Sequence, residues 1–197
     1  MLSISRHIRF NDDKSVVTNF SYEDISEILN NGLGTIENIS PEREYNGAME
    51  IRSIENKITK DTNQIHLCFN TKGCSLTSDM RYEVAIISNT LAGNMSSRLF
   101  QKIREDRGLA YSVFSYTSSF EEGGLFTVYA GTTKKDYKEV LEIIENEFED
   151  IKENGITEYE LQKSKNQFLS AVTFGLESSK GRMNRMANSY LLYKEIK

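Results

Sequence analysis

The sequence has 197 residues, of which 38% are hydrophobic and 27% are charged, and it contains a single proline. This composition is typical of a globular protein, and a chain of this length can bury roughly 70% of its unfolded surface. The net charge of −5 argues against a nucleic acid or an anionic membrane as the partner. Only two histidines, His7 and His66, are present, which excludes most self-contained metal sites.

The first residues, MLSISRHIRFNDDK, contain no apolar core of signal-peptide length, and no apolar run approaches the ~18 residues of a membrane-spanning helix. The two cysteines, Cys68 and Cys74, form no C-x-x-C motif. We therefore expect a cytoplasmic protein with two reduced, half-buried thiols, and a disulfide or a reactive thiol is the alternative.

The first third of the chain is predicted to alternate short strands with one helix. Strands are expected at residues 15–18, 49–54 and 64–70, the last with alternating apolar side chains. A helix at 22–29 should begin at Ser21 as N-cap, with Asp24 as the acidic partner of a capping box, and Asn31-Gly32 and Gly34 should end it. Residues 35–48 carry the only proline and are expected to form a surface connection.

The remainder predicts two helices, a strand hairpin and three further helices. Helices are expected at 78–91 and 97–107, the second ending at a left-handed Gly108. Strands at 109–118 and 125–132 should pair antiparallel. An amphipathic helix at 137–153 precedes a helix that begins with the capping box of Thr157 and Glu160, and a last helix starts near residue 179. The sequence predicts an α+β fold over a single domain, 1–197, with helices covering one face of a mainly antiparallel sheet.

A search for catalytic motifs finds no complete site. No H-x-x-E-H, H-E-x-x-H, phosphate-binding glycine loop or G-x-S-x-G elbow occurs. His66 and Cys68 share one face of a predicted strand, but a third ligand is missing, so a structural histidine is the better interpretation. We therefore expect no catalytic residue and no metal ligand in this chain.

One dense block, residues 91–113, reads as helix end, tight loop, capped helix, glycine stop and strand. A tight turn at Gly108 would bring Arg104 and Tyr111 to the same end of the sheet. A guanidinium fork and a phenol O–H could together bind a backbone carbonyl or a developing oxyanion. Chemistry alone favours the alternative of a surface arginine beside a half-buried strand tyrosine.

Residues 91–111 resemble the L-G-G-x-M-S-S-R-L-F-x-x-I-R-E-x-R-G-L-A-Y stretch of the pitrilysin family of zinc metallopeptidases. This family includes insulin-degrading enzyme and the mitochondrial processing peptidases, and the chain is most similar to its bacterial processing-protease-like members. Flanking segments agree with the family pattern, among them Gln64-Ile65-His66 and Gly155-Ile156-Thr157. The similarity extends from about residue 15 to the end of the sequence.

The resemblance implies a protein built from two homologous α+β halves that face each other. The front half holds zinc through H-x-x-E-H, whose glutamate is a general base, and the rear half carries no metal. Arg104 and Tyr111 match the rear-half pair that binds the substrate backbone and polarises the scissile carbonyl. The implied partners are a zinc-bearing N-terminal half, or a homologous subunit, and a peptide substrate. No cofactor is expected in this chain.

Three departures from the family pattern qualify this expectation. The zinc motif is absent, so the chain resembles only the rear half and is not expected to be an active enzyme by itself. Its opening strand near Val17 is expected to be shortened, and it stops at Lys197 before the family's closing helical segment, so we expect a domain truncated at both ends. The alternatives are a non-catalytic module that binds peptides or a partner subunit, and a truncated remnant without function.

Overall fold

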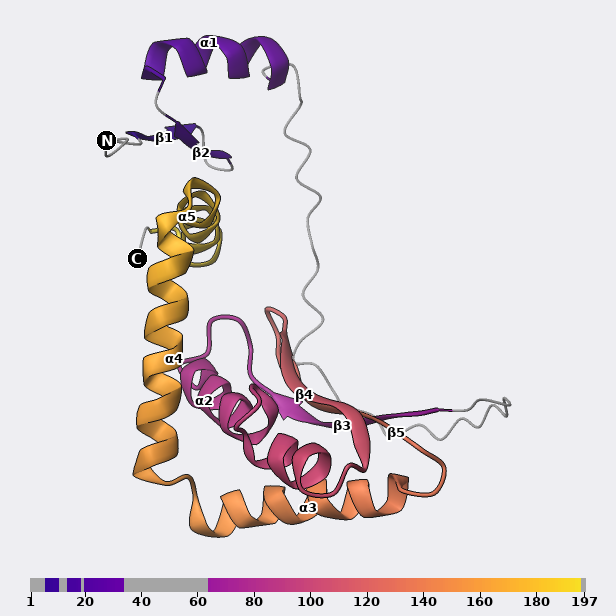
Figure 1. Ribbon diagram of the computed structural model, residues 1–197. Helices are drawn as coiled ribbons and strands as arrows, with labels where there is room; N and C mark the ends of the chain where they lie inside the picture. The colour runs from indigo at the N-terminus through magenta and orange to yellow at the C-terminus, as the bar shows by residue number, and fades with distance from the viewer. Residues whose placement is uncertain (1–5, 11–13, 19, 34–63, 196–197) are drawn as a thin grey trace. The chain divides into compact units, whose positions relative to one another are not determined.

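The structure is a computed structural model that describes residues 6–10, 14–18, 20–33 and 64–195 (Figure 1). The chain divides into two compact units, which are described separately: Met1–Asn46 with Phe168–Lys197, and Gly47–Gln167. The strand predicted at 49–54 and the connection predicted at 35–48 lie outside the described residues. The single-domain organisation stays a prediction.

The first unit contains a two-stranded sheet and helices. β1 (Arg6–Phe10) pairs antiparallel with β2 (Lys14–Thr18), and β2 packs against α5 (Ser179–Tyr193). α1 (Tyr22–Leu33) begins as predicted, because the Ser21 hydroxyl accepts a hydrogen bond from the Asp24 amide at 3.1 Å and donates one to the Asp24 carboxylate at 2.7 Å. The helix ends at Leu33, within the stretch from Asn31 to Gly34 that was predicted to end it. β1 was not predicted from the sequence.

The sheet of the second unit has three antiparallel strands in the order β3-β5-β4. Its strands are β3 (Ile65–Gly73), β4 (Ala110–Ser119) and β5 (Gly124–Thr132). The predicted hairpin is confirmed, since β4 and β5 pair antiparallel with Val113 opposite Ala130. β5 occupies the centre, which explains why most of its residues are buried.

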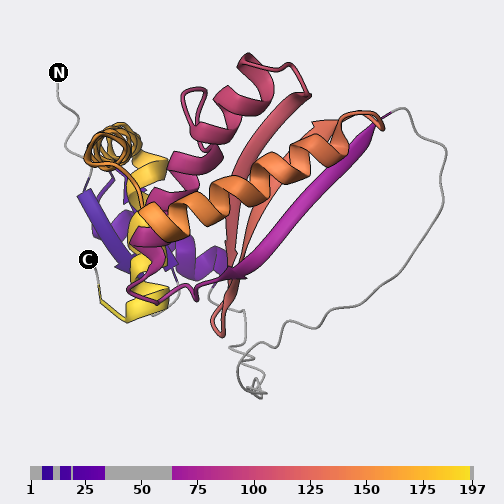
Figure 2. The same ribbon diagram turned by 90° about the horizontal axis from the view of Figure 1, so that it is seen from below.

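Helices cover one face of this sheet (Figure 2). They are α2 (Arg81–Ala92), the π-helix η1 (Phe100–Glu105) and α3 (Tyr137–Asn154), and α4 (Glu158–Glu177) follows α3. The core between helices and sheet is centred on side chains with no exposed surface: Leu91, Leu99, Ile103, Val128, Ala130, Val140 and Ile144. This arrangement confirms the predicted α+β class.

Aromatic side chains occupy the opposite face of the sheet. Phe114 and Tyr116 are 44% and 45% exposed, and the Phe114 ring stacks on Tyr129 with centroids 4.7 Å apart. The Nδ1 atom of His66 lies 2.6 Å from the hydroxyl of Tyr129, as expected for a histidine with a structural hydrogen bond. On the same strand as His66, Cys68 is exposed rather than half-buried as predicted, and it is not in a disulfide.

Candidate functional site

The helix that carries Arg104 differs from the regular helix predicted at 97–107. A short helical turn at Arg98 and Leu99 leads into η1, where the Asp106 amide donates to the Gln101 carbonyl at 2.9 Å, five residues back. Apolar residues spaced three or four apart bury one side of either kind of helix, so the spacing could not distinguish them. Phe100 and Ile103 face the core, and the Arg104 side chain remains 40% exposed.

η1 is followed by a glycine stop, as predicted. Gly108 has a φ of +61°, and its amide donates to the Arg104 carbonyl at 3.1 Å, while the Leu109 amide donates to the Ile103 carbonyl at 2.8 Å. A left-handed residue costs an L-amino acid about 1 kcal/mol but costs glycine nothing. The chain therefore reverses here and enters β4 directly.

Tyr111 occupies an irregularity in the β4–β5 ladder. Ala110 pairs with Thr132 and Ser112 pairs with Gly131, so Tyr111 is an extra residue on β4. Such a bulge redirects the side chain that it carries. The Tyr111 side chain is accordingly directed into solvent, with 81% of the residue's surface exposed.

The turn at Gly108 brings the two predicted site residues together. The guanidinium carbon of Arg104 lies 5.5 Å from the centroid of the Tyr111 ring and 4.9 Å from that of Phe100. Both distances fall within the ~6 Å range of a cation–π contact. A carboxylate oxygen of Glu105 lies 3.9 Å from the Arg104 Nε. The positive charge of Arg104 is thus placed beside an exposed phenol.

A hollow of about 500 Å³ lies beside this pair. Its lining comes from the residue before β3, the end of η1, the turn into β4 and the end of β5: Gln64, Arg104, Gly108, Leu109, Ala110, Tyr111, Gly131, Thr132 and Thr133. A Cβ atom at Gly131 would lie 2.9 Å from the Gln64 amide nitrogen and from the Ser112 hydroxyl, so glycine keeps this wall clear. The hollow offers hydrogen-bond donors from a guanidinium and a phenol, which suit a carbonyl or an oxyanion.

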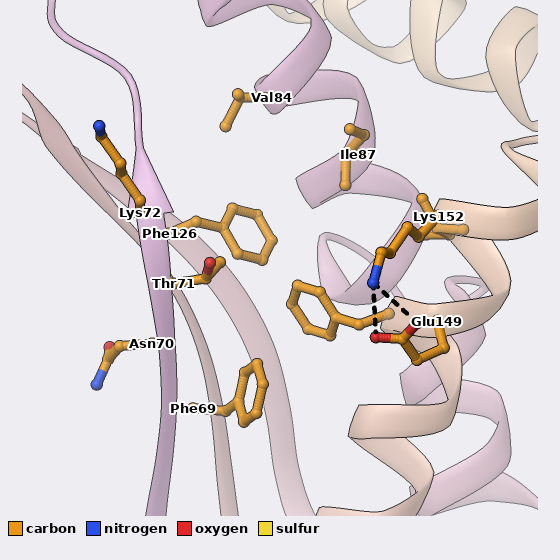
Figure 3. Close-up of a pocket in the computed structure, with 11 residues that line it drawn as sticks. Phe69, Asn70, Thr71, Lys72, Val84, Ile87, Phe126, Glu149 and Lys152 are labelled. Carbon is orange, nitrogen blue, oxygen red and sulfur yellow. Dashed lines mark hydrogen bonds and ion pairs between the residues drawn. The ribbon is translucent and has the colours of Figure 1, made fainter.

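A second pocket, of about 450 Å³, opens between β3, α2 and α3 (Figure 3). Its walls are mainly apolar, and Glu149 and Lys152 form an ion pair of 3.1 Å at its side. Lys72 and Asn70 point away from it in Figure 3. This pocket is an opening into the apolar core and contains neither of the predicted site residues.

Within the part of the chain that the structure describes, no group of three or more histidine, cysteine, aspartate or glutamate side chains could hold a metal ion. The sequence also contains no H-x-x-E-H motif. The described residues therefore do not fit a zinc site of the pitrilysin type. None of the described helices is both long enough and apolar enough to cross a membrane.

Comparison with known proteins places the chain in a family. The family model described as "Peptidase M16 inactive domain" matches residues 15–168. The chain is 42% identical over 133 residues to the "Uncharacterized zinc protease YmxG" of Bacillus subtilis, covering 68% of this chain and 32% of that protein. It is 40% identical over 138 residues to the "Uncharacterized zinc protease SCO5738" of Streptomyces coelicolor, covering 70% of this chain and 30% of that protein.

A solved structure agrees at the level of the fold. The peptidase M16 inactive domain from Pseudomonas fluorescens matches with a TM-score of 0.70 and 21% identity, over 91% of this chain and 45% of that chain. The chain spans about a third of the length of the two bacterial zinc proteases. The resemblance to the metal-free half of pitrilysin-type peptidases is thereby confirmed, and this chain belongs to the peptidase M16 inactive domain family.

Proposed function

We propose that this chain is the substrate-binding, chamber-closing half of a two-part zinc endopeptidase that acts on peptides or unfolded segments. In this proposal Arg104 and Tyr111 donate hydrogen bonds to a backbone carbonyl of the substrate and help to polarise it. Zinc and its general base belong to the partner half, either an N-terminal half or a homologous subunit, and residues of this chain neither bind the metal nor act as the general base.

One observation carries the proposal: the Arg104 guanidinium and the exposed Tyr111 ring are in contact beside an open hollow. Two features of the backbone create this contact, and each of them orients a side chain toward the hollow or the solvent. The left-handed glycine turns the chain back, and the bulge directs the tyrosine outward. A purely structural tyrosine on this strand would be packed against neighbours, as Phe114 is against Tyr129.

The proposal is tested first by peptide binding. Fluorescence anisotropy with a labelled, extended peptide should give weaker binding for Tyr111→Phe, which removes only the hydroxyl. A net hydrogen bond of about 0.5–1.5 kcal/mol corresponds to a loss of roughly two- to tenfold in affinity. Arg104→Lys should weaken binding further, because lysine keeps the charge but loses the planar fork. Tyr116→Phe, on the same strand and partly exposed, is the matched control and should bind like the wild type.

The second test is cleavage. The chain alone, supplied with zinc, should not cleave the peptide, and cleavage should appear when a family half bearing H-x-x-E-H is added. In that mixture Tyr111→Phe should lower kcat/KM, and Tyr116→Phe should not. Robust cleavage by the isolated chain, or equal activity of both variants, would contradict the proposal. Peptide binding without cleavage in any mixture would instead favour the non-catalytic binding module.

A further inference from the structure

We propose that Arg98 is a positioning residue, which acts through the carboxylates of α3 and α4 to hold η1 in the orientation that places Arg104 against Tyr111. The inference rests on the proposed function of the Arg104–Tyr111 pair. It concerns a residue that does not line the hollow and to which the sequence pattern assigned no role.

Arg98 connects three parts of the second unit. Its Nε and Nη2 atoms donate to the two oxygens of the Glu160 carboxylate on α4, at 2.6 and 2.8 Å. Its Nη1 donates to Asp150 on α3 at 2.7 Å, and Nη2 reaches the Gly155 carbonyl in the intervening turn at 3.4 Å. Only 16% of the side chain is exposed. A two-point guanidinium–carboxylate contact of this kind fixes direction as well as distance.

A second tie runs from the same carboxylate cluster into η1. Glu147 on α3 is 3% exposed and pairs with Lys102 of η1, while its other oxygen lies 3.7 Å from Arg98 Nη1. Arg98 therefore faces Glu147, Asp150 and Glu160, and Lys102 also contacts this cluster. Loss of the Arg98 guanidinium would leave the partly buried carboxylates with too little positive charge nearby to offset their desolvation cost.

The cluster is suited to control the rotation of η1. Leu99 and Ile103 are fully buried, so they fix how closely the helical segment packs on the core. Apolar contacts are non-directional, however, and they tolerate rotation of the helix. Arg98 and Arg104 belong to one continuous helical segment, so a rotation or shift at Arg98 is transmitted to Arg104. The Arg104–Tyr111 distance of 5.5 Å is close to the ~6 Å limit of the contact, so a displacement of about 1 Å would break it.

An exposed ion pair just after this segment is unsuited to the same role. Arg107 binds Glu139 at 2.9 Å, but both side chains are about half exposed, at 52% and 48%. Exposed pairs of this kind constrain geometry weakly because solvent and salt compete with them. Arg107→Lys is therefore a matched control, since it makes the same chemical change in the turn that follows η1 without altering the buried cluster.

The test compares Arg98→Lys with Arg107→Lys by two independent measurements on the full chain. NMR of the Arg104 side-chain Nε–Hε group reports ring-current shifts from Phe100 and Tyr111 and needs no peptide. We expect this resonance to move toward its random-coil position in Arg98→Lys and to stay unchanged in Arg107→Lys. An unchanged Arg104 resonance in a folded Arg98→Lys protein would overturn the proposal.

Peptide affinity then tests whether the effect passes through Arg104. Arg98→Lys should weaken binding by about three- to tenfold in the wild-type background and by less than about twofold in the Arg104→Lys background, because residues that act through one another are not additive. Equal losses in both backgrounds would also overturn the proposal. If the Arg104 resonance moves while neither Arg98→Lys nor Tyr111→Phe changes affinity, the positioning role holds and the proposed binding function fails.

A milder variant keeps the test decisive if Arg98→Lys does not fold. Asp150→Asn removes the charge of the most exposed of the three carboxylates that face Arg98 and leaves the Glu160 contact intact. It should shift the Arg104 resonance in the same direction by a smaller amount. A folded Asp150→Asn protein with a wild-type resonance would then count against the proposal.

Discussion

The carboxylate of Glu160 should make the stability of the second unit depend on pH in the acid range. Arg98 binds both of its oxygens, and the amide and hydroxyl of Thr157 donate to Oε2 at 2.8 and 2.9 Å. The hydrogen bonds from Arg98, aided by those from Thr157, lower the pKa of Glu160 from 4.5 to about 2 against the opposing effect of burial. The perturbation that tests this coupling is Glu160→Gln, which fixes a neutral side chain of nearly the same shape.

The size and direction of the effect follow from this pKa. Because the folded state favours ionised Glu160, its contribution to the free energy of unfolding is fully present above pH 4.5 and is lost as the pH falls toward 2. A shift of this size corresponds to at most about 3 kcal/mol. The side chain is 21% exposed, and solvent screening reduces the expected contribution to about 1–2 kcal/mol.

Urea unfolding, followed by circular dichroism between pH 7 and pH 2.5, measures this contribution. Glu160→Gln should be less stable than the wild type by about 1–2 kcal/mol at pH 7, and the difference should shrink steadily below pH 4.5. Glu158→Gln is the matched control, since it removes an exposed charge from the same first turn of α4. The reasoning is refuted if the two variants have the same stability at pH 7, or if the loss in Glu160→Gln is independent of pH.

Two further predictions concern the core and the glycine turn. The Ile144 side chain has 0% exposure between α3 and the sheet. Ile144→Ala should lower the free energy of unfolding in urea by about 2–5 kcal/mol, and Ile144→Val should lower it by about 0.5–1.5 kcal/mol. Equal losses for the two variants would indicate that the site is not close-packed. Gly108→Ala should cost about 1 kcal/mol by the same assay, because its φ is +61° although no atom lies within 4 Å of the added Cβ. Gly175→Ala, in the last turn of α4 with equal space, should instead be stabilising by about 0.5–1 kcal/mol, and the same sign for both would refute the backbone explanation.

Several features of this fold could be predicted because they depend on neighbours in the sequence. The capping box of Thr157 and Glu160 joins residues three apart, and the structure forms it with the Glu160 amide 3.2 Å from the Thr157 hydroxyl. The left-handed Gly108 and the β4–β5 hairpin were predicted for the same reason, since a glycine stop and two aromatic and β-branched segments joined by a glycine-containing loop are local signals. The candidate site was found because Arg104 and Tyr111 lie in one short block whose pattern resembles a known family.

The remaining features depended on contacts between distant residues. The order β3-β5-β4 places the last strand in the centre, which the order along the chain does not indicate. The bulge that turns Tyr111 outward appears only when β4 is paired with β5, and the π-helix has the same apolar spacing as an ordinary helix.

The sequence by itself determined the helices, the hairpin, the family and the two candidate binding residues, because local propensity and a dense motif are properties of contiguous residues. Tertiary structure decided how these residues are presented. Arg98 and Glu160 are 62 positions apart, and nothing in either local pattern predicts their contact. Only the packing of η1 and α3 on one sheet, with the start of α4 beside them, brings the guanidinium into the carboxylate cluster, because the ion pairs form where the burial of apolar side chains has already placed the backbones.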